Sequence, residues 1–222
     1  MKLPKSEVMS LADNITIRPH QIVSKKLAHQ DDVHVSLFSF DGAESVSEQA
    51  NSEDIFIFVL EGTVAVETPA HYQATSGQVL AIPRGTLHRV HSVTPSKIFQ
   101  YSTNKGEPPM EQFIKKVNQR EILDLAAALD YEEGGISSLA MVQRNSLTIT
   151  LMAFDAGERI ASHSSNGDAL VQVLEGTAAI DIDGTPYTIP AGKSIIMPAG
   201  TPHAVAAAHG QFKMMLTVVK PQ

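Results

Sequence analysis

One short motif occurs twice in this chain, and it constrains the fold more than any other feature. The first copy runs from Gly77 to His88 and the second from Gly192 to His203. Both fit the pattern G-x5-P-x-G-x2-H, in which an apolar run precedes a Pro-x-Gly turn and a histidine follows it. An apolar run bounded by turn residues predicts a buried β-strand, a tight turn and a further strand that begins near the histidine.

The sequence around the motif repeats as well. Residues 59–63 and 173–177 are identical, Val-Leu-Glu-Gly-Thr, and their glycines lie 114 positions apart (176 − 62). At the motif histidines the offset is 115 (203 − 88), because the second copy has one extra residue near Asp183-Gly184, a dipeptide typical of hairpin turns. An insertion confined to a turn is expected when two copies share one fold. We therefore predict two domains, residues 1–103 and 119–222, joined by a linker and leading segment over 104–118.

Alternation of apolar and polar residues dominates both copies. It is clear in two equivalent stretches: Val33, Val35 and Leu37, and Leu147, Ile149 and Leu151. Many short alternating strands with Gly, Pro and Asp turns predict an all-β sandwich or barrel. A short helix is expected ahead of each set of strands. The first covers residues 8–12, and the second begins at a capping box of Asn118 and Glu121 and continues to Leu129.

Composition excludes several classes of function. The formal net charge is −7, so we expect neither a nucleic-acid partner nor an anionic membrane surface. No apolar run has the roughly 18 to 20 residues that a membrane helix needs. The chain has no cysteine, which removes disulfides, thiolate catalysis and Cys-ligated metal sites. With no apolar signal-peptide core near Met1, we expect a cytoplasmic protein.

The repeated motif resembles the second conserved motif of the cupin superfamily. Over its whole length the chain resembles a two-domain cupin, or bicupin, similar to small bacterial conserved-barrel (cupin type 2, RmlC-like) proteins. The resemblance implies a tandem of double-stranded β-helix, or jelly-roll, barrels. We expect the two barrels to pack as an intramolecular pseudo-dimer, since each leaves an apolar sheet face to cover. Whether two chains also form a homodimer is left open.

The first cupin motif, broadly G-x5-H-x-H-x3,4-E-x6-G, is incomplete in the second copy. Gly157 and His163 fit, but Ser165 stands at the second histidine and Ala169 at the glutamate. The metal set of three histidines and one glutamate that the resemblance implies is thus reduced to His163 and His203.

The first copy departs further from the cupin pattern. There the repeat places Gln49, Asn51 and Ile55 at the three positions of the first motif, and His88 alone remains. Divalent ions in such sites need three or four nitrogen or oxygen ligands. We therefore expect the first barrel to be a degenerate structural partner.

Three alternatives follow for the second barrel. In one, His163 and His203 hold a divalent transition metal (Zn, Ni, Fe, Mn or Cu) in an active or metal site. In another, the protein is a non-catalytic module that binds or senses a small molecule without metal. In the third, the two histidines only bond water or each other. We identify no catalytic residue, and whether the protein is an enzyme stays open.

Further residues are candidates for a ligand pocket or its lining. Asp168 is a candidate to complete a metal shell, and Lys213, between apolar neighbours, either points into the barrel or lies exposed. Four methionines predict a flexible apolar lining in the second copy, which either fills the core or adapts to an apolar ligand: Met152, Met197, Met214 and Met215. The candidate pocket residues are Ser165, Asp168, Lys213, Gln49 and His88.

Overall fold

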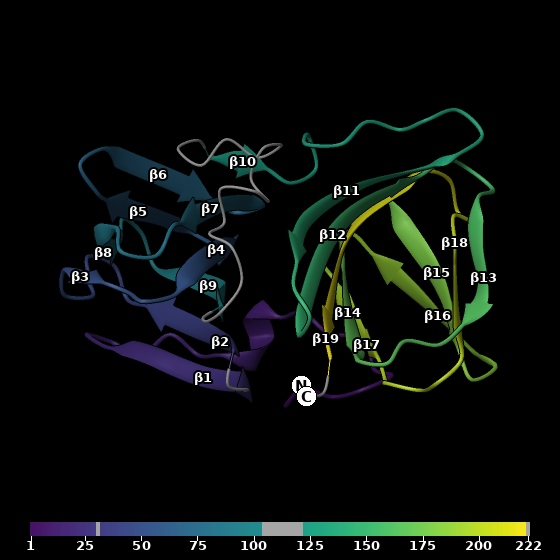
Figure 1. Ribbon diagram of the computed structural model, residues 1–222, viewed down its shortest axis with the longest axis horizontal. Helices are drawn as coiled ribbons and strands as arrows, with labels where there is room; N and C mark the ends of the chain where they lie inside the picture. The colour runs from purple at the N-terminus through teal and green to yellow at the C-terminus, as the bar shows by residue number, and fades with distance from the viewer. Residues whose placement is uncertain (30–31, 104–121, 221–222) are drawn as a thin grey trace. The chain divides into compact units, whose positions relative to one another are not determined.

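The computed structural model describes residues 1–29, 32–103 and 122–220 (Figure 1). The described residues are almost entirely β-strand and turn, arranged as two barrels. The first barrel contains β1 (Ile22–His29), β2 (Val33–Phe40), β3 (Gln49–Ala50), β4 (Asp54–Glu61), β5 (Thr63–Glu67), β6 (His71–Thr75), β7 (Gln78–Ile82), β8 (Leu87–Ser92), β9 (Ser96–Thr103) and β10 (Leu123–Asp124). The second contains β11 (Ile136–Gln143), β12 (Leu147–Phe154), β13 (Arg159–His163), β14 (Asp168–Glu175), β15 (Thr177–Ile182), β16 (Thr185–Pro190), β17 (Ser194–Met197), β18 (His203–Ala206) and β19 (Phe212–Val219).

Each barrel is built from two antiparallel sheets. In the first barrel the strand orders are β1-β2-β9-β4-β7-β10 and β3-β8-β5-β6. In the second they are β11-β12-β19-β14-β17 and β13-β18-β15-β16, and Figure 1 shows these two sheets facing each other. Alternate residues of a strand point to opposite faces, so the inward residues of both sheets form one core. This core includes Val171, Val173, Ile180 and Ile195 in the second barrel.

The duplication predicted from sequence is visible strand by strand. β1 pairs with β2 in the same register as β11 with β12, and each pair has a register shift at the equivalent place. β9 and β19 are offset by 116 positions (212 − 96), so a further residue is inserted between the motif histidine and the last strand. Both last strands carry a lysine at the same site: Lys97 contacts Glu61 at 3.0 Å and Lys213 contacts Glu175 at 3.6 Å.

The leading segment of each copy does not stay with the strands that follow it in sequence. Leu3–Ser10 belongs to the compact unit that contains Leu125–Gln222, and the other unit comprises Lys2 and Leu11–Asp124. Met9 forms a bridge with Ser194 of β17, and Leu123 of β10 pairs with Val79 of β7. These pairs are equivalent, and each gives backbone partners to the edge of a sheet. The units therefore differ at their ends from the predicted ranges 1–103 and 119–222; the predicted linker, 104–118, lies outside the described residues.

The two predicted helices are not present in the described residues. A three-residue 3-10 helix, η1 (Ala12–Asn14), begins at the last residue of the first predicted segment. In the second, β10 replaces the helix and a turn follows it at 125–128, while the proposed capping residues Asn118 and Glu121 lie outside the description. Short helices are marginal on their own, and pairing with a sheet edge offers the same backbone groups a better set of hydrogen bonds. The prediction of a helix ahead of each set of strands was therefore wrong over the described residues.

The repeated pentapeptide Val-Leu-Glu-Gly-Thr ends in a turn that requires glycine. Gly62 and Gly176 have φ values of +79° and +71°, in the left-handed region. A Cβ at Gly176 would lie 2.2 Å from the Gln211 carbonyl oxygen, and one at Gly62 would lie 2.2 Å from that of Pro95. Both the backbone conformation and the close packing explain why glycine occupies this position in the two copies.

Candidate functional site

Two neighbouring strands place His163 and His203 opposite each other in the second barrel. His163 ends β13, His203 begins β18, and the two residues are opposite each other in the antiparallel register. The Pro-x-Gly turn directs the second histidine, because Thr201 donates to the Pro198 carbonyl at 3.2 Å and Gly200 donates to that of Ser165 at 2.8 Å. The ring centroids are 4.6 Å apart, and the rings lie at 65° to each other.

Both imidazole rings are oriented by the same hydrogen bond. Nδ1 of His163 lies 2.9 Å from the Ala161 carbonyl oxygen, and Nδ1 of His203 lies 2.9 Å from that of Thr201. A carbonyl oxygen only accepts, so Nδ1 carries the proton on each ring. In a neutral ring, Nε2 is then left with its lone pair. This is the arrangement that metal-binding or hydrogen-bond-accepting histidines use.

His203 is neutral near pH 7. Burial lowers its pKa below the usual value, and the neighbouring His163 lowers it further, against an opposing effect of the hydrogen bond to Thr201. His203 is 2% exposed, whereas His163 lies on the exposed side of the pair. The buried ring is thus held as a neutral base with its Nε2 lone pair available.

The two histidines line a cavity of about 450 Å³ in the second barrel. Ser164, Ser165 and Asn166 contribute the other polar side chains of its lining. The rest of the lining is apolar and comes from both sheets: Met152, Ile160, Ala169, Met197, Val205, Met214, Leu216 and Val218. Three of the four methionines predicted for this lining are therefore present. Met215 follows Met214 on β19 and faces the opposite side of the sheet.

Asp168 does not line the cavity, although the sequence made it a candidate to complete a metal shell. Its carboxylate accepts hydrogen bonds from the Lys5 ammonium at 2.7 Å, from the N-terminal amine of Met1, and from the backbone N–H of Ala199 at 3.2 Å. Burial alone would raise the pKa of Asp168, but these hydrogen bonds outweigh it and the pKa is lowered. The carboxylate is therefore ionised and neutralised by the leading segment.

Lys213, a candidate for the pocket, does not line the cavity either, because its ammonium binds groups outside it. Its ammonium donates to the Ala126 carbonyl at 2.7 Å, contacts Glu175 at 3.6 Å and lies 4.7 Å from the centre of the Tyr131 ring. Burial, with the nearby charge of Glu175, raises the pKa of Tyr131 to about 12. The lysine thus belongs to a structural cluster outside the cavity lining.

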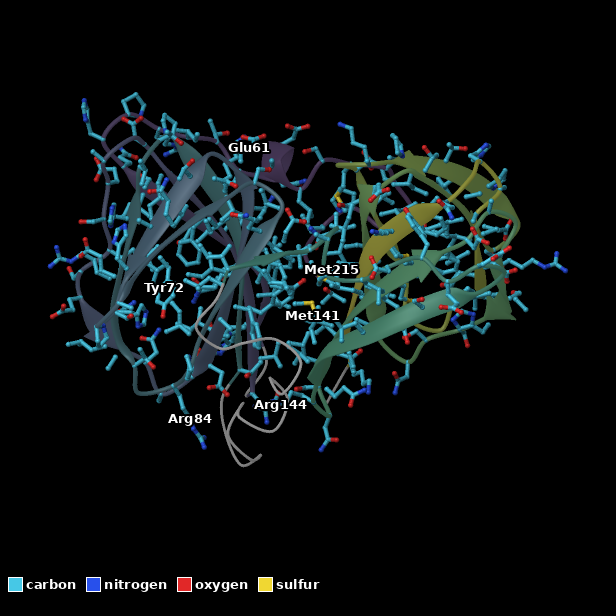
Figure 2. The ribbon with its side chains drawn as sticks, turned by 90° about the horizontal axis from the view of Figure 1, so that it is seen from above. Glu61, Tyr72, Arg84, Met141, Arg144 and Met215 are labelled. Atoms are coloured by element: carbon cyan, nitrogen blue, oxygen red, sulfur yellow. The ribbon has the colours of Figure 1, made fainter. Side chains whose placement is uncertain are left out.

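The first barrel has the same strand pairing at this place, but glutamine replaces one of the two histidines. Gln49 lies opposite His88 in the register between β3 and β8, and Nδ1 of His88 lies 2.8 Å from the Thr86 carbonyl oxygen. Asp54, the counterpart of Asp168, accepts a hydrogen bond from the backbone N–H of Arg84 at 2.9 Å. The Arg84 side chain extends outward from the turn (Figure 2). Gln49 and His88 are therefore neighbours, as the repeat predicts, in a barrel separate from the histidine pair.

The donor set of the second barrel does not match the metal set that the cupin resemblance implies. Ser165 and Ala169 occupy the positions of the second histidine and the glutamate, and Ala169 is 1% exposed within the cavity lining. Among the described residues, no group of three or more His, Asp or Glu side chains is placed to hold a metal ion. The described lining of this cavity offers two imidazoles and no carboxylate, which does not suit a hard divalent ion.

The remaining cavity residues carry little signal in the sequence. Ser164 and Asn166 flank Ser165, so their position on the same loop was the available clue. The apolar residues that complete the lining follow the strand alternation already noted, but alternation alone does not distinguish a cavity wall from a filled core.

None of the helices in the described part of the chain has the length and apolar character needed to span a membrane.

These features define a tandem all-β barrel protein, and comparison with known proteins identifies its class. Residues 150–220 match the family described as Cupin domain. A search of curated proteins found no match. Among solved structures, a cupin 2 conserved barrel domain protein from Leptotrichia buccalis is 26% identical, with a TM-score of 0.87 over 99% of each chain. Residues 150–220 are thus similar to a cupin domain, and the whole chain shares the tandem-barrel fold of the cupin 2 conserved barrel domain protein.

Two further structures show the same fold at lower identity. A variant of salicylate 1,2-dioxygenase from Pseudoaminobacter salicylatoxidans, in complex with gentisate, is 15% identical with a TM-score of 0.65, over 97% of this chain and 83% of that one. The protein Ylba from E. coli is 13% identical with a TM-score of 0.61, over 96% of this chain and 89% of that one. At these identities the likeness concerns the fold.

Proposed function

We propose that the second barrel binds a small molecule in its cavity and that His163 and His203 together hold one transition-metal ion against which the polar end of that molecule docks. The observation that carries this proposal is the pair of Nδ1–H hydrogen bonds to backbone carbonyls. They leave two Nε2 lone pairs on rings 4.6 Å apart that line one cavity.

The cavity favours a ligand with an apolar body and one polar or anionic end. Its walls are largely aliphatic and thioether, which bind apolar surface without orienting it. Polar groups gather at the histidines and at Ser165, so the polar end of a ligand is expected there. That one of the related structures was solved with gentisate supports a small-molecule ligand for this barrel type. A metal held by the two histidines would supply Lewis-acid polarisation of a ligand oxygen.

A second candidate function is binding of a small molecule with no metal. The absence of a carboxylate from the described cavity lining favours it, because two imidazoles alone hold a divalent ion weakly. In this case the Nε2 lone pairs accept hydrogen bonds from the ligand directly. The protein would then be a binding or sensing module and no enzyme.

Metal content and ligand binding separate the two candidates. The protein is purified without tag or chelator, and its metals are counted by plasma mass spectrometry beside His163→Ala/His203→Ala. His88→Ala is the matched control, since it removes the equivalent ring from the first barrel. About one equivalent of metal in the wild type and in the control, lost in the double variant, supports the metal site. Negligible metal in all three overturns it, and histidine-dependent thermal shifts with small organic acids would then support the second candidate.

A further inference from the structure

We propose that the metal selected by this cavity is monovalent copper, and that the thioether of Met197 binds it together with His163 and His203. The proposal rests on the metal site put forward above and specifies its chemistry. It is built on the disagreement between the donor set in this cavity and the set that a divalent ion requires.

Charge is the first argument. The described lining contains no carboxylate, and the nearby Asp168 is already neutralised by Lys5 and by the N-terminal amine. A divalent ion placed here would have two positive charges and no anionic protein ligand to compensate them, at a site walled by apolar side chains. Cu(I) carries one charge, and neutral nitrogen and sulfur donors suit it.

The second argument is the type of side chain in the lining. Met152, Met197 and Met214 all line the cavity that contains the two imidazoles. Thioether sulfur is a soft donor that selects Cu(I) and has little affinity for Mg²⁺, Ca²⁺ or Mn²⁺. Two imidazoles and a thioether provide three ligands without any carboxylate.

Register identifies Met197 as the thioether best placed to share an ion with the histidines. Met197 lies directly opposite Ala169 in the pairing of β17 with β14. Ala169 stands where the cupin pattern has its glutamate, and its small side chain leaves space there. The turn 198–202 joins Met197 to His203, so one turn carries two of the proposed ligands.

Met152 and Met214 lie further along the sheet. They are partners in the pairing of β12 with β19, and Met214 is opposite Val173. Val173 lies four residues beyond Ala169 on β14, which is about 13 Å along a strand. These two methionines therefore line a different level of the cavity.

The first barrel provides an internal comparison. Where Gln49 replaces His163, the three methionines are also replaced, by Phe38 for Met152, Ile82 for Met197 and Ile98 for Met214. If methionine were needed only to fill a barrel of this fold, the first copy would be expected to use it too. Instead, the three methionines occur in the barrel that has both histidines, and the barrel with one histidine lacks them.

Copper affinity measured by chelator competition tests the proposal. Full-length protein is titrated with Cu(I) under anaerobic, reducing conditions against a chromophoric Cu(I) chelator, and separately with Zn(II). Met197→Leu keeps the volume of the side chain and removes the sulfur. We expect it to weaken Cu(I) binding at least about tenfold and to leave Zn(II) binding within about threefold. Met152→Leu and Met215→Leu are the controls and should bind Cu(I) as the wild type does. X-ray absorption of the loaded wild type should show one sulfur scatterer that Met197→Leu lacks.

The outcomes distinguish this proposal from the one it rests on. Copper binding that depends on the histidines but is unchanged in Met197→Leu, or stronger binding of Zn(II) or Ni(II), would overturn the copper proposal and leave the histidine metal site standing. Failure to bind any of these metals in a folded wild type would overturn both. The circular dichroism spectrum of each variant shows whether it is folded.

Discussion

Gln49 lies opposite His88 in the first barrel, at the register position where the second barrel sets one histidine against another. The chain therefore contains its own demonstration that glutamine is accommodated at this position without loss of the barrel. We predict that His163→Gln folds normally, with the free energy of unfolding changed by less than about 1 kcal/mol, because the side chain is exposed. Its metal content should fall to that of the double alanine variant. Retention of the metal would show that His163 is not a ligand.

Restoring the cupin metal set is expected to create affinity for divalent ions. Ser165→His/Ala169→Glu places the missing imidazole and carboxylate beside His163 and His203. Four protein ligands with one negative charge should raise Zn(II) or Ni(II) affinity at least about tenfold, measured by competition with a chromogenic chelator. Asn51→His/Ile55→Glu makes the same change in the first barrel, where Gln49 leaves one ligand missing. A smaller gain in metal affinity is expected there, and an equal gain would contradict the assignment of His163 as a metal ligand.

The ion pair between Lys5 and Asp168 is expected to stabilise the second unit in a pH-dependent way. Asp168→Asn leaves the Lys5 ammonium and the N-terminal amine without their anionic partner, and we expect a loss of about 1–3 kcal/mol at pH 7. The folded pKa of Asp168 lies below its unfolded value of 3.8. The stabilisation is therefore fully present above about pH 4 and is lost as the pH falls through the folded pKa.

Urea unfolding at pH 7 and at pH 3 checks this sign. The free energy of unfolding of Asp168→Asn should lie closer to that of the wild type at pH 3 than at pH 7. Lys5→Met should lose less free energy of unfolding than Asp168→Asn at pH 7, with the same trend. A difference that grows on acidification would mean that the carboxylate is not held ionised by these partners.

Glycine at the end of the repeated pentapeptide is expected to be essential for stability. Gly176→Ala forces a Cβ to within 2.2 Å of a backbone oxygen at a φ of +71°, and we expect a cost of more than about 3 kcal/mol. Gly192→Ala is the matched control. It has a φ of +80° but no atom within 4 Å of the added Cβ, so about 1 kcal/mol is expected. Thermal melts that rank the two variants equally would contradict the packing argument.

The pairing of Met9 with β17 is expected to protect the edge of that sheet. The Met9 N–H donates to Ser194 at 2.9 Å and its carbonyl accepts from Ser194 at 2.8 Å. Met9→Pro removes the donor, whereas Met9→Ala keeps both backbone groups. Hydrogen exchange at Ser194 should accelerate in the proline variant at least about tenfold and change little in the alanine variant. Equal exchange rates at Ser194 in the two variants would show that β17 is protected without its pairing to Met9.

Much of the candidate site was predictable because it depends on spacing within a few residues. His163 and His203 were identified from two motifs, and the structure places them opposite each other. Their hydrogen bonds reach only two residues back along the chain, to Ala161 and Thr201. By contrast, Asp168 was a candidate to complete a metal shell, and Lys213 was a candidate for the pocket because it lies between apolar neighbours. Their partners, Lys5 and Ala126, are 163 and 87 positions away, and no local pattern indicates contacts of that range.

The sequence by itself determined the duplication, the alternation of the strands, the turn glycines and the histidine pair, since each follows from local steric and periodic constraints. Tertiary structure decided which sheet edge each leading segment joins and where the charges of Asp168 and Lys213 are neutralised. It also decided that the segment before the second set of strands pairs with β7 instead of forming a helix. These outcomes depend on which backbone and charged groups are left without partners once the barrels close, and that is a property of the folded chain.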